Sequence, residues 1–305
     1  MTRVVVAGAG SIGSLLAAHL ARVAEVTVLT RREEQATALR EQGLRVSGRS
    51  DFTARLDATT DPAALPDAEL AILACKGTDL EPLAARLKGT LPGATVMTIQ
   101  NGLGAEEIVA AHGEWPLLSA VTFMSGTRHG DAHVEYVLDT ATWIGPYRGT
   151  TEEDARGTAE LVESAGLKAE AFADLRPAQW SKLIFNATVN GVAALTGLPH
   201  DVHFAQESEP SELGNLVHAL MDEGVAAAIA AGIALHDDPW RMNLLATERG
   251  SAHFPSMLED VEARRRTEVD AINGALVREA LRRGVEVPLQ SALLALVRGR
   301  EASYL

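Results

Sequence analysis

One lysine and two asparagines share a face of a predicted helix, and their types and spacing suit chemistry on an oxygen atom. Lys182, Asn186 and Asn190 follow one another at intervals of four within the mainly apolar run from 180 to 190. This spacing places them on one side of an α-helix, with a drift of about 40° per step. Only four of the 27 basic residues are lysines, so a lysine among apolar neighbours needs a reason of its own.

Lys182 is a candidate proton donor. Burial of an ammonium group is costly, and desolvation would lower the pKa of this lysine toward the range useful for general acid catalysis. Asn186 and Asn190 would add hydrogen-bonding groups to the same small volume. The alternative is a lysine whose stem lies on the core while its ammonium group reaches solvent, beside asparagines that bond to the backbone.

A glycine-rich turn near the N-terminus predicts a nucleotide site. The short apolar strand Arg3–Ala7 runs into Gly8-Ala9-Gly10-Ser11-Ile12-Gly13, and a helical pattern follows. In a βαβ unit such glycines permit a tight turn, a close approach to pyrophosphate and close helix packing, while the helix N-terminus offers N–H groups. The alternative is a glycine turn that binds no nucleotide. The predicted cofactor-binding residues are Gly8, Gly10, Ser11, Ile12 and Gly13.

The end of the second predicted strand indicates which cofactor is bound. Glu25–Leu29 is followed by Thr30-Arg31-Arg32, where an NAD-specific fold usually has an acidic residue for the ribose 2′-hydroxyl. Arginines at this point favour a 2′-phosphate, so we expect Arg31 to bind NADP(H). The alternative is that Glu33 or Glu34 binds the ribose and the arginines are solvated.

Two further apolar strands, Leu70–Ala74 and Ala94–Ile99, each end in a polar cluster. Strands that alternate with helices form a mainly parallel sheet, and its carboxyl edge is where ligands bind. Lys76 follows the first strand and Asn101 the second, so we expect both beside the cofactor. Ordinary turn chemistry is the alternative, especially for Asn101 before a glycine.

The pattern of elements predicts an α/β fold in two domains. Residues 1–172 alternate strand and helix, with β-like stretches between 117 and 145 that would complete the sheet. From Asp174 onward the pattern is almost wholly helical, and residues 174–177 would open the first helix. We expect an N-terminal Rossmann-type doubly wound sheet that binds NADP(H), followed by an all-helical C-terminal domain, 173–305, that binds and converts the substrate. Residues 199–210 predict a surface loop.

Ser256 and Glu268 are twelve residues apart, a separation of about 18 Å in an unbroken helix. They can share a small ligand only if the helix breaks between them. We predict a break near Arg265, with Thr267 capping a new helix, Asp270 completing a capping-box pair and Glu268 in the first turn. The alternative makes Ser256 a plain N-cap and Glu268 a solvated acid.

Composition excludes several classes of protein. A formal charge of −14 argues against nucleic acid as a partner, since duplex binding needs a basic patch. No apolar stretch approaches the roughly 20 residues of a membrane span, and the early first strand leaves no room for a signal peptide. Cys75 is the only cysteine, which fits a cytoplasmic chain, and the nine histidines lack metal-ligand spacing. We therefore expect neither membrane association nor a metal.

Five separated motifs, in this order, resemble those of the ketopantoate reductase family, and the resemblance covers essentially the whole chain. The motifs are Gly8-x-Gly10-x-x-Gly13, Asn101-Gly102, Lys182-x-x-x-Asn186-x-x-x-Asn190, Ser256-Met257-Leu258 and Arg266-Thr267-Glu268-Val269-Asp270. In that family a Rossmann domain and a helical domain enclose NADPH and 2-dehydropantoate, whose keto group is reduced in pantothenate biosynthesis.

The resemblance implies that Lys182 donates a proton to the developing alkoxide and that Glu268 orients the substrate hydroxyl. It implies substrate-binding roles for Asn186, Asn190, Ser256 and Asn101, and cofactor-binding roles for Arg31, Lys76 and Asn101. The partner would be a small 2-keto acid, and a homodimer is one expectation for a helical second domain. Two alternatives remain: a related reductase or dehydrogenase of another 2-keto or hydroxy acid, and an NADP(H)-binding regulatory protein without turnover.

Overall fold

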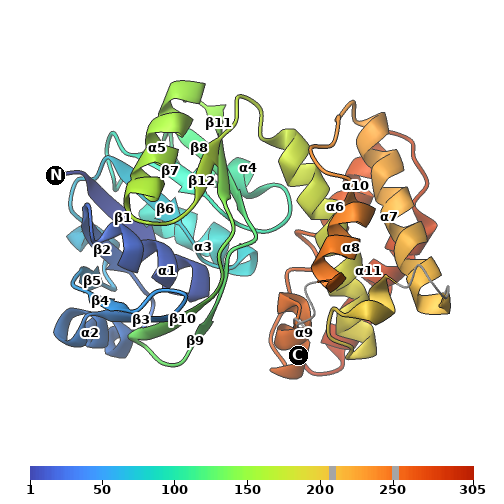
Figure 1. The fold of residues 1–305 in the computed structure, drawn as a ribbon. Helices are drawn as coiled ribbons and strands as arrows, with labels where there is room; N and C mark the ends of the chain where they lie inside the picture. The colour runs from blue at the N-terminus through green and yellow to red at the C-terminus, as the bar shows by residue number, and fades with distance from the viewer. Residues whose placement is uncertain (206–210, 249–253) are drawn as a thin grey trace. The chain divides into compact units, whose positions relative to one another are not determined.

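The computed structural model describes residues 1–205, 211–248 and 254–305 (Figure 1). The chain forms two compact units. The first comprises Met1–Gln100 and Ala105–Leu175, and the second comprises Asn101–Gly104 and Arg176–Leu305. The four residues Asn101–Gly104 therefore pack with the second unit although the first unit continues on both sides of them in the sequence.

The first unit is built on an eight-stranded sheet in the order β12-β11-β8-β7-β6-β1-β2-β5. Its strands are β1 (Arg3–Ala7), β2 (Glu25–Leu29), β5 (Asp57–Thr59), β6 (Leu70–Leu73), β7 (Thr95–Thr98), β8 (Leu117–Thr122), β11 (Thr142–Arg148) and β12 (Ala169–Ala171). Neighbouring strands are parallel except β8 and β11. Strand order reverses at β1, which pairs with β2 on one side and β6 on the other. The predicted doubly wound sheet is confirmed.

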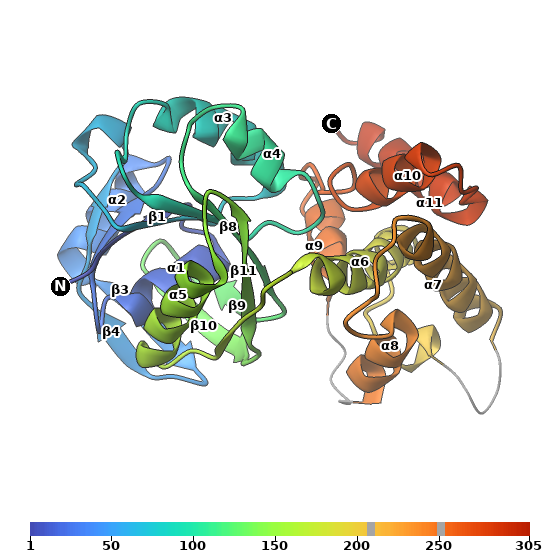
Figure 2. The same ribbon diagram turned by 90° about the horizontal axis from the view of Figure 1, so that it is seen from above.

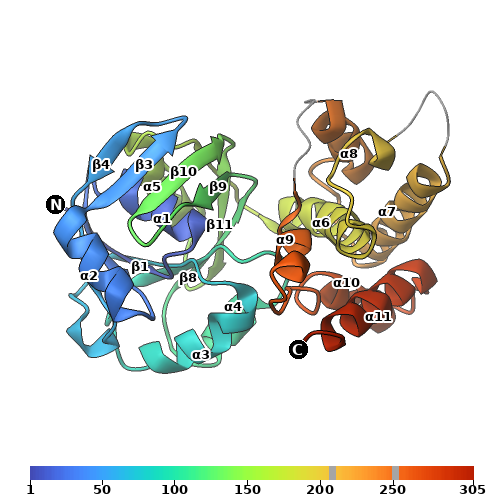
Figure 3. The same ribbon diagram turned by 90° about the horizontal axis from the view of Figure 1, so that it is seen from below.

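Both faces of this sheet are covered by helices (Figures 2 and 3). The helices of the unit are α1 (Ser11–Leu20), α2 (Glu33–Gln42), α3 (Gly77–Leu87), α4 (Ala105–Ala110) and α5 (Glu152–Ser164). Val4 and Val6 of β1 face the core formed with α1 and α5, while Val5 and Ala7 face the core formed with α3 and α4. Successive side chains point to opposite faces, so a strand covered on both sides is apolar throughout, as β1 is.

A second, four-stranded sheet has the order β4-β3-β10-β9. It consists of β3 (Leu44–Gly48), β4 (Phe52–Ala54), β9 (Ser125–Arg128) and β10 (His133–Leu138). The stretches expected to complete the main sheet, 117–123 and 142–144, do so as β8 and β11, whereas β9 and β10 between them belong to the second sheet. Helix α1 contacts β1 and β2 on one side and β3, β9 and β10 on the other, so it lies between the two sheets (Figure 3).

The second unit is a group of helices around α6 (Arg176–Thr196), which begins where the sequence predicts. Helix α6 contacts α7 (Glu212–Ala230), α8 (Pro239–Glu248), α9 (Ser256–Glu262), α10 (Asn273–Arg282) and α11 (Pro288–Ala302). Together these helices enclose one apolar core. Among the helices within the described ranges, none is both long enough and apolar enough to span a membrane.

The predicted surface loop at 199–210 is right only in part for the described residues 199–205, where Val202 and His203 are exposed. His200 and Phe204 are buried, and residues Val202–Phe204 form a short 3-10 helix. The His200 ring bonds to the Asn243 side-chain oxygen at 2.8 Å, and the Asn243 amide donates to the Phe204 carbonyl oxygen. These contacts with α8 anchor a segment that looks polar in the sequence. Residues 206–210 lie outside the described residues.

Candidate active site

The glycine turn between β1 and α1 has the shape that a dinucleotide requires. Gly8 has φ 111°, and a Cβ atom there would lie 2.6 Å from the backbone nitrogen of Cys75. A Cβ atom on Gly13 would lie 1.9 Å from the Gly8 carbonyl oxygen. Nothing lies within 4 Å of a Cβ atom built on Gly10. Two of the glycines therefore permit close packing, and the third leaves its face of the turn open.

The start of α1 is suited to an anion. Gly10 is the N-cap residue and offers no side-chain hydrogen bond, and the first turn contains no acidic residue. The N–H groups of a first helical turn have no partner within the helix and carry a partial positive charge. The residues from Gly8 to Gly13 thus fit the pyrophosphate of a dinucleotide.

Two residues that sequence analysis missed hold this turn in place. The Gln35 amide and the Arg128 guanidinium both donate to the Ala9 carbonyl oxygen, at 3.1 and 3.2 Å. The Thr30 hydroxyl in turn donates to Gln35 at 2.6 Å. Arg128 lies on β9 of the second sheet, so no local pattern could have connected it with the turn. Gln35 belongs to α2 and is buried. The one sequence feature that could have identified it is a polar residue on the face of the helix that packs on the core.

Arg31 and Lys76 follow the strands on either side of β1, and Arg31 is already paired. Arg31 follows β2, and its Nη1 atom lies 3.0 Å from the Asp79 carboxylate in the first turn of α3. Lys76, after β6, is the exposed N-cap residue of the same helix. Glu33 accepts hydrogen bonds from Arg40 and Thr60, and the bond from Arg40 is the main cause of its lowered pKa. Arg31 and Lys76 therefore follow the two strands that flank β1. Glu33, the alternative ribose-binding residue, is bonded to Arg40 and Thr60.

Asn101 lies with the loop that carries Glu268. The Asn101 amide donates to the Glu268 carboxylate at 3.3 Å, and the Leu103 N–H donates to the Ala271 carbonyl oxygen at 3.1 Å. Gly102 has φ 93°, and a Cβ atom there would lie 2.0 Å from the Ala271 carbonyl oxygen. The Asn-Gly pair is thus a close contact between two loops, which explains why this turn packs with the helical unit.

Glu268 lies in an irregular loop, residues 263–272, between α9 and α10. The predicted break is confirmed, since α9 ends at Glu262 and Arg264 has φ 51°. The predicted capping is right only in part: the Thr267 hydroxyl accepts from the Val269 N–H at 3.2 Å, but α10 begins only at Asn273 and Glu268 lies in the turn before that helix. The Thr267 N–H bonds to Glu301 and the Asp270 carboxylate bonds to Arg298, so both expected capping partners are engaged by α11.

The polar stripe on α6 meets this loop. Lys182 and Asn186 are half-buried and Asn190 is buried, while Ser256 is exposed at the first position of α9. Burial lowers the pKa of Lys182 to about 8, against the field of Glu268, which raises it. Glu268 is itself buried. The structure therefore brings Lys182, Glu268 and Asn101 into one electrostatic group, and the desolvated lysine argues against an ammonium group that simply reaches solvent.

An ammonium group with a pKa near 8 is mostly protonated at neutral pH and gives up its proton readily. A neighbouring carboxylate keeps the lysine charged, and it can also accept a hydrogen bond from a ligand hydroxyl. The group is thus equipped to donate a proton to an oxygen atom on which negative charge develops.

Comparison with known proteins agrees with this geometry. Residues 4–149 match the family described as "Ketopantoate reductase PanE/ApbA", and residues 174–301 match "Ketopantoate reductase PanE/ApbA C terminal". A 2-dehydropantoate 2-reductase of Archaeoglobus fulgidus is 31% identical over 300 residues, which cover 98% of each chain. The chain belongs to the ketopantoate reductase family. It is therefore an NAD(P)-dependent oxidoreductase.

Solved structures share the fold of this family member. A PanE/ApbA family ketopantoate reductase from Ralstonia eutropha JMP134 is similar with a TM-score of 0.89 and 28% identity, over 99% of both chains. A D-mandelate dehydrogenase solved with NADH and anilino(oxo)acetate has a TM-score of 0.87 over 99% of both chains. At 23% identity this second likeness concerns the fold alone.

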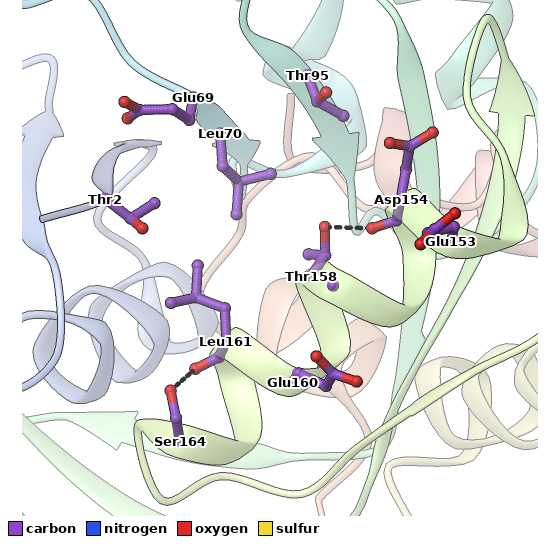
Figure 4. Close-up of a pocket in the computed structure, with 11 residues that line it drawn as sticks. Thr2, Glu69, Leu70, Thr95, Glu153, Asp154, Thr158, Glu160, Leu161 and Ser164 are labelled. Atoms are coloured by element: carbon purple, nitrogen blue, oxygen red, sulfur yellow. Dashed lines mark hydrogen bonds between the residues drawn. The ribbon is translucent and has the colours of Figure 1, made fainter.

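A hollow of about 540 Å³ lies elsewhere on the ketopantoate reductase fold, between α5 and the amino ends of β1, β6 and β7 (Figure 4). Thr2, Glu69 and Thr95 line it from the sheet, and Asp154 and Thr158 from α5. The glycine turn and the ends of β2 and β6 that carry Arg31 and Lys76 lie at the carboxyl edge of the sheet, whereas this hollow lies at the amino edge.

In the part of the chain that the structure describes, no group of three or more His, Cys, Asp or Glu side chains could hold a metal ion.

Proposed function

We propose that this family member reduces 2-dehydropantoate to pantoate with NADPH and that Lys182 is the proton donor. The observation that carries the proposal is the pairing of a desolvated lysine with a buried carboxylate: Lys182 has a pKa of about 8, and Glu268 is held by Asn101. Reduction of a ketone builds negative charge on its oxygen atom, and a positioned ammonium group both stabilises and protonates that atom.

NADPH, when bound, supplies the hydride. The residues proposed to hold it are Gly8, Gly10, Ser11, Ile12, Gly13, Arg31, Lys76 and Asn101. The open face at Gly10 and the uncapped start of α1 support the pyrophosphate position. Arg31 would bind the 2′-phosphate, and its exposed position and five donors let it do so while it also contacts Asp79.

The substrate would lie against the polar stripe of α6. Asn186, Asn190 and Ser256 are the residues proposed to bind the oxygen atoms of the keto acid, and Glu268 would orient the substrate hydroxyl. Support comes from the half-buried positions of Lys182 and Asn186, which lie on the same side of α6 as the buried Asn190. A substrate with several oxygen atoms would satisfy these donors together.

The test is the initial rate of NADPH oxidation with 2-dehydropantoate, with NADH and a plain 2-keto acid as parallel controls. We expect fast turnover with NADPH and 2-dehydropantoate, and slower turnover in both controls. Turnover of only the plain 2-keto acid would show that the proposed substrate is wrong and that the proposed reduction of a keto group is right. Tight NADPH binding without oxidation by any keto acid would contradict the proposal and favour a regulatory protein.

A further inference from the structure

The loop that carries Glu268 is held from outside, by the C-terminal end of the chain. The Glu301 carboxylate accepts a hydrogen bond from the Thr267 backbone N–H, directly before Glu268. The Tyr304 hydroxyl donates to the Arg265 carbonyl oxygen at 3.0 Å. The Arg298 guanidinium bonds to the Asp270 carboxylate, with its Nε atom at 2.9 Å. These contacts fall on both sides of Glu268.

One stripe of α11 and the turn that follows it supplies all three contacts. Residues 298, 301 and 304 are spaced by three, which places them near one another on one side of a helix. Within the loop, the Glu268 carbonyl oxygen accepts from the Ala271 and Ile272 N–H groups, and the Asn101–Gly104 turn adds bonds to Glu268 and Ala271 from outside. The position of the loop relative to α6 therefore depends on contacts from other elements, such as these.

The three contacts differ in expected strength. The Arg298–Asp270 pair is exposed on both sides, and such pairs contribute little. Thr267 is buried, so its N–H group would lose a charge-assisted bond and stay desolvated without Glu301. Tyr304 also packs on the helical core, so only its hydroxyl is specific to the loop. Glu301 and Tyr304 are thus the contacts that matter most.

We propose that Glu301 and Tyr304 are positioning residues that set the place of Glu268 relative to Lys182 and thereby the rate of the proton-donating step. The inference rests on the proposed function of Lys182 and Glu268. A displacement of about 1 Å at a catalytic group can cost on the order of a hundredfold in rate, so a loosened loop has a measurable effect without unfolding the protein.

The pKa of Lys182 reports the position of Glu268. The carboxylate whose field raises this pKa is Glu268. If Glu268 moves away, the raising effect weakens while desolvation remains. A change at Glu301 or Tyr304 that lowers the pKa of Lys182 must therefore act through the loop.

The first experiment is steady-state kinetics of Glu301→Ala, Glu301→Gln and Tyr304→Phe. We expect about a tenfold fall in kcat for Glu301→Ala, a partial rescue by glutamine and a fall of about threefold for Tyr304→Phe. The KM for NADPH should stay constant, and the basic limb of the kcat–pH profile should move to lower pH. Glu286→Gln, which removes an exposed carboxylate from the same unit, is the matched control.

The second experiment reads the same contact without turnover. The chain has four lysines, so reductive [13C]methylation yields few NMR signals, and Lys182→Arg assigns the one of interest. We expect Lys182 to titrate at lower pH in Glu301→Ala and Tyr304→Phe than in the wild type and in Glu286→Gln.

The two experiments separate the possible failures. A wild-type protein without keto acid turnover, but with shifted Lys182 titration in the variants, would contradict the proposed function and support the positioning role. Unchanged titration in all folded variants would overturn the positioning role. If Glu301→Ala does not fold, Glu301→Gln and Tyr304→Phe, which keep the side-chain volume, carry the test.

Discussion

The glycine turn and the Glu268 loop are built in opposite ways. The turn is one contiguous stretch, Gly8–Gly13, in which two glycines permit the close packing, and Gln35 and Arg128 add bonds only to its Ala9 carbonyl oxygen. The loop obtains its position from Asn101–Gly104, α6 and α11, which are far apart in the sequence. A short local motif is enough to shape a turn that fits a pyrophosphate. The Lys182–Glu268 group, in contrast, is assembled from several elements of the chain.

The largest expected effect tests the assembled region. Lys182→Ala should lower kcat by about 10²- to 10⁴-fold, because this is the contribution of a positioned general acid. Circular dichroism and the melting temperature check that the variant is folded. Lys88→Ala, at an exposed position in the first unit, is the control and should keep wild-type turnover. Unchanged turnover in folded Lys182→Ala would show that another group donates the proton.

The local region is tested by two alanine substitutions that differ in their surroundings. Gly8→Ala should destabilise the fold by about 1–3 kcal/mol, because φ is 111° and the new Cβ atom would meet backbone atoms. Gly10→Ala has open space and an ordinary φ of −75°, so it should keep the melting temperature. We expect both to weaken NADPH binding in a fluorescence titration. Wild-type affinity in Gly10→Ala would contradict the proposed pyrophosphate position.

The cofactor preference is tested at Arg31. Arg31→Ala should weaken NADPH binding about tenfold and leave NADH binding nearly unchanged, since only NADPH has a 2′-phosphate for this guanidinium. Calorimetric titration with NADP⁺ and NAD⁺ measures both affinities independently of turnover. Arg55→Ala, which also removes an arginine from the first unit, is the control. An equal loss for both cofactors would mean that Arg31 acts on the shared part of the molecule.

The smallest expected effect is a shift in pH dependence. Lys182 must be protonated to act, so kcat should be constant below its pKa and fall as pH rises through about 8. Glu268→Gln removes the field that raises this pKa, so the basic limb should move to lower pH. A rate profile from pH 6 to 10 measures both proteins. The same limb in both would mean that the observed titration belongs to a group other than Lys182.

Local pattern was sufficient for much of the fold. The bounds of β1 and β2 agree with the sequence, and α6 begins where the chain turns from alternating strands to helices. In these elements the apolar residues recur at a regular spacing and the flanking residues mark the ends. Neighbouring elements cover the apolar side chains, as the pattern predicts. The strands at 70 and 94 are one or two residues shorter than expected, at ends where pairing stops.

Long-range pairing explains the errors. A strand pattern does not specify its partner, so the sequence does not reveal the second sheet, in which His133 of β10 pairs with Arg45 of β3, 88 residues earlier. Thr267 and Asp270 have the spacing of a capping box, yet α11 competes for both. The burial of Phe204 is also a long-range effect, because contacts with α8 bury part of a segment that is polar in sequence.

The sequence by itself determined the position of the glycine turn, the strand and helix periods and the stripe of Lys182, Asn186 and Asn190, because each is a pattern of residues within a few positions of one another, whereas the bonds from Gln35 and Arg128 to the turn are tertiary. Only the tertiary structure decided that Asn101 contacts Glu268, that Glu268 acts on Lys182 and that the end of α11 holds the loop between them. Those contacts join segments 34 to 167 residues apart, and no short-range preference encodes which of them meet.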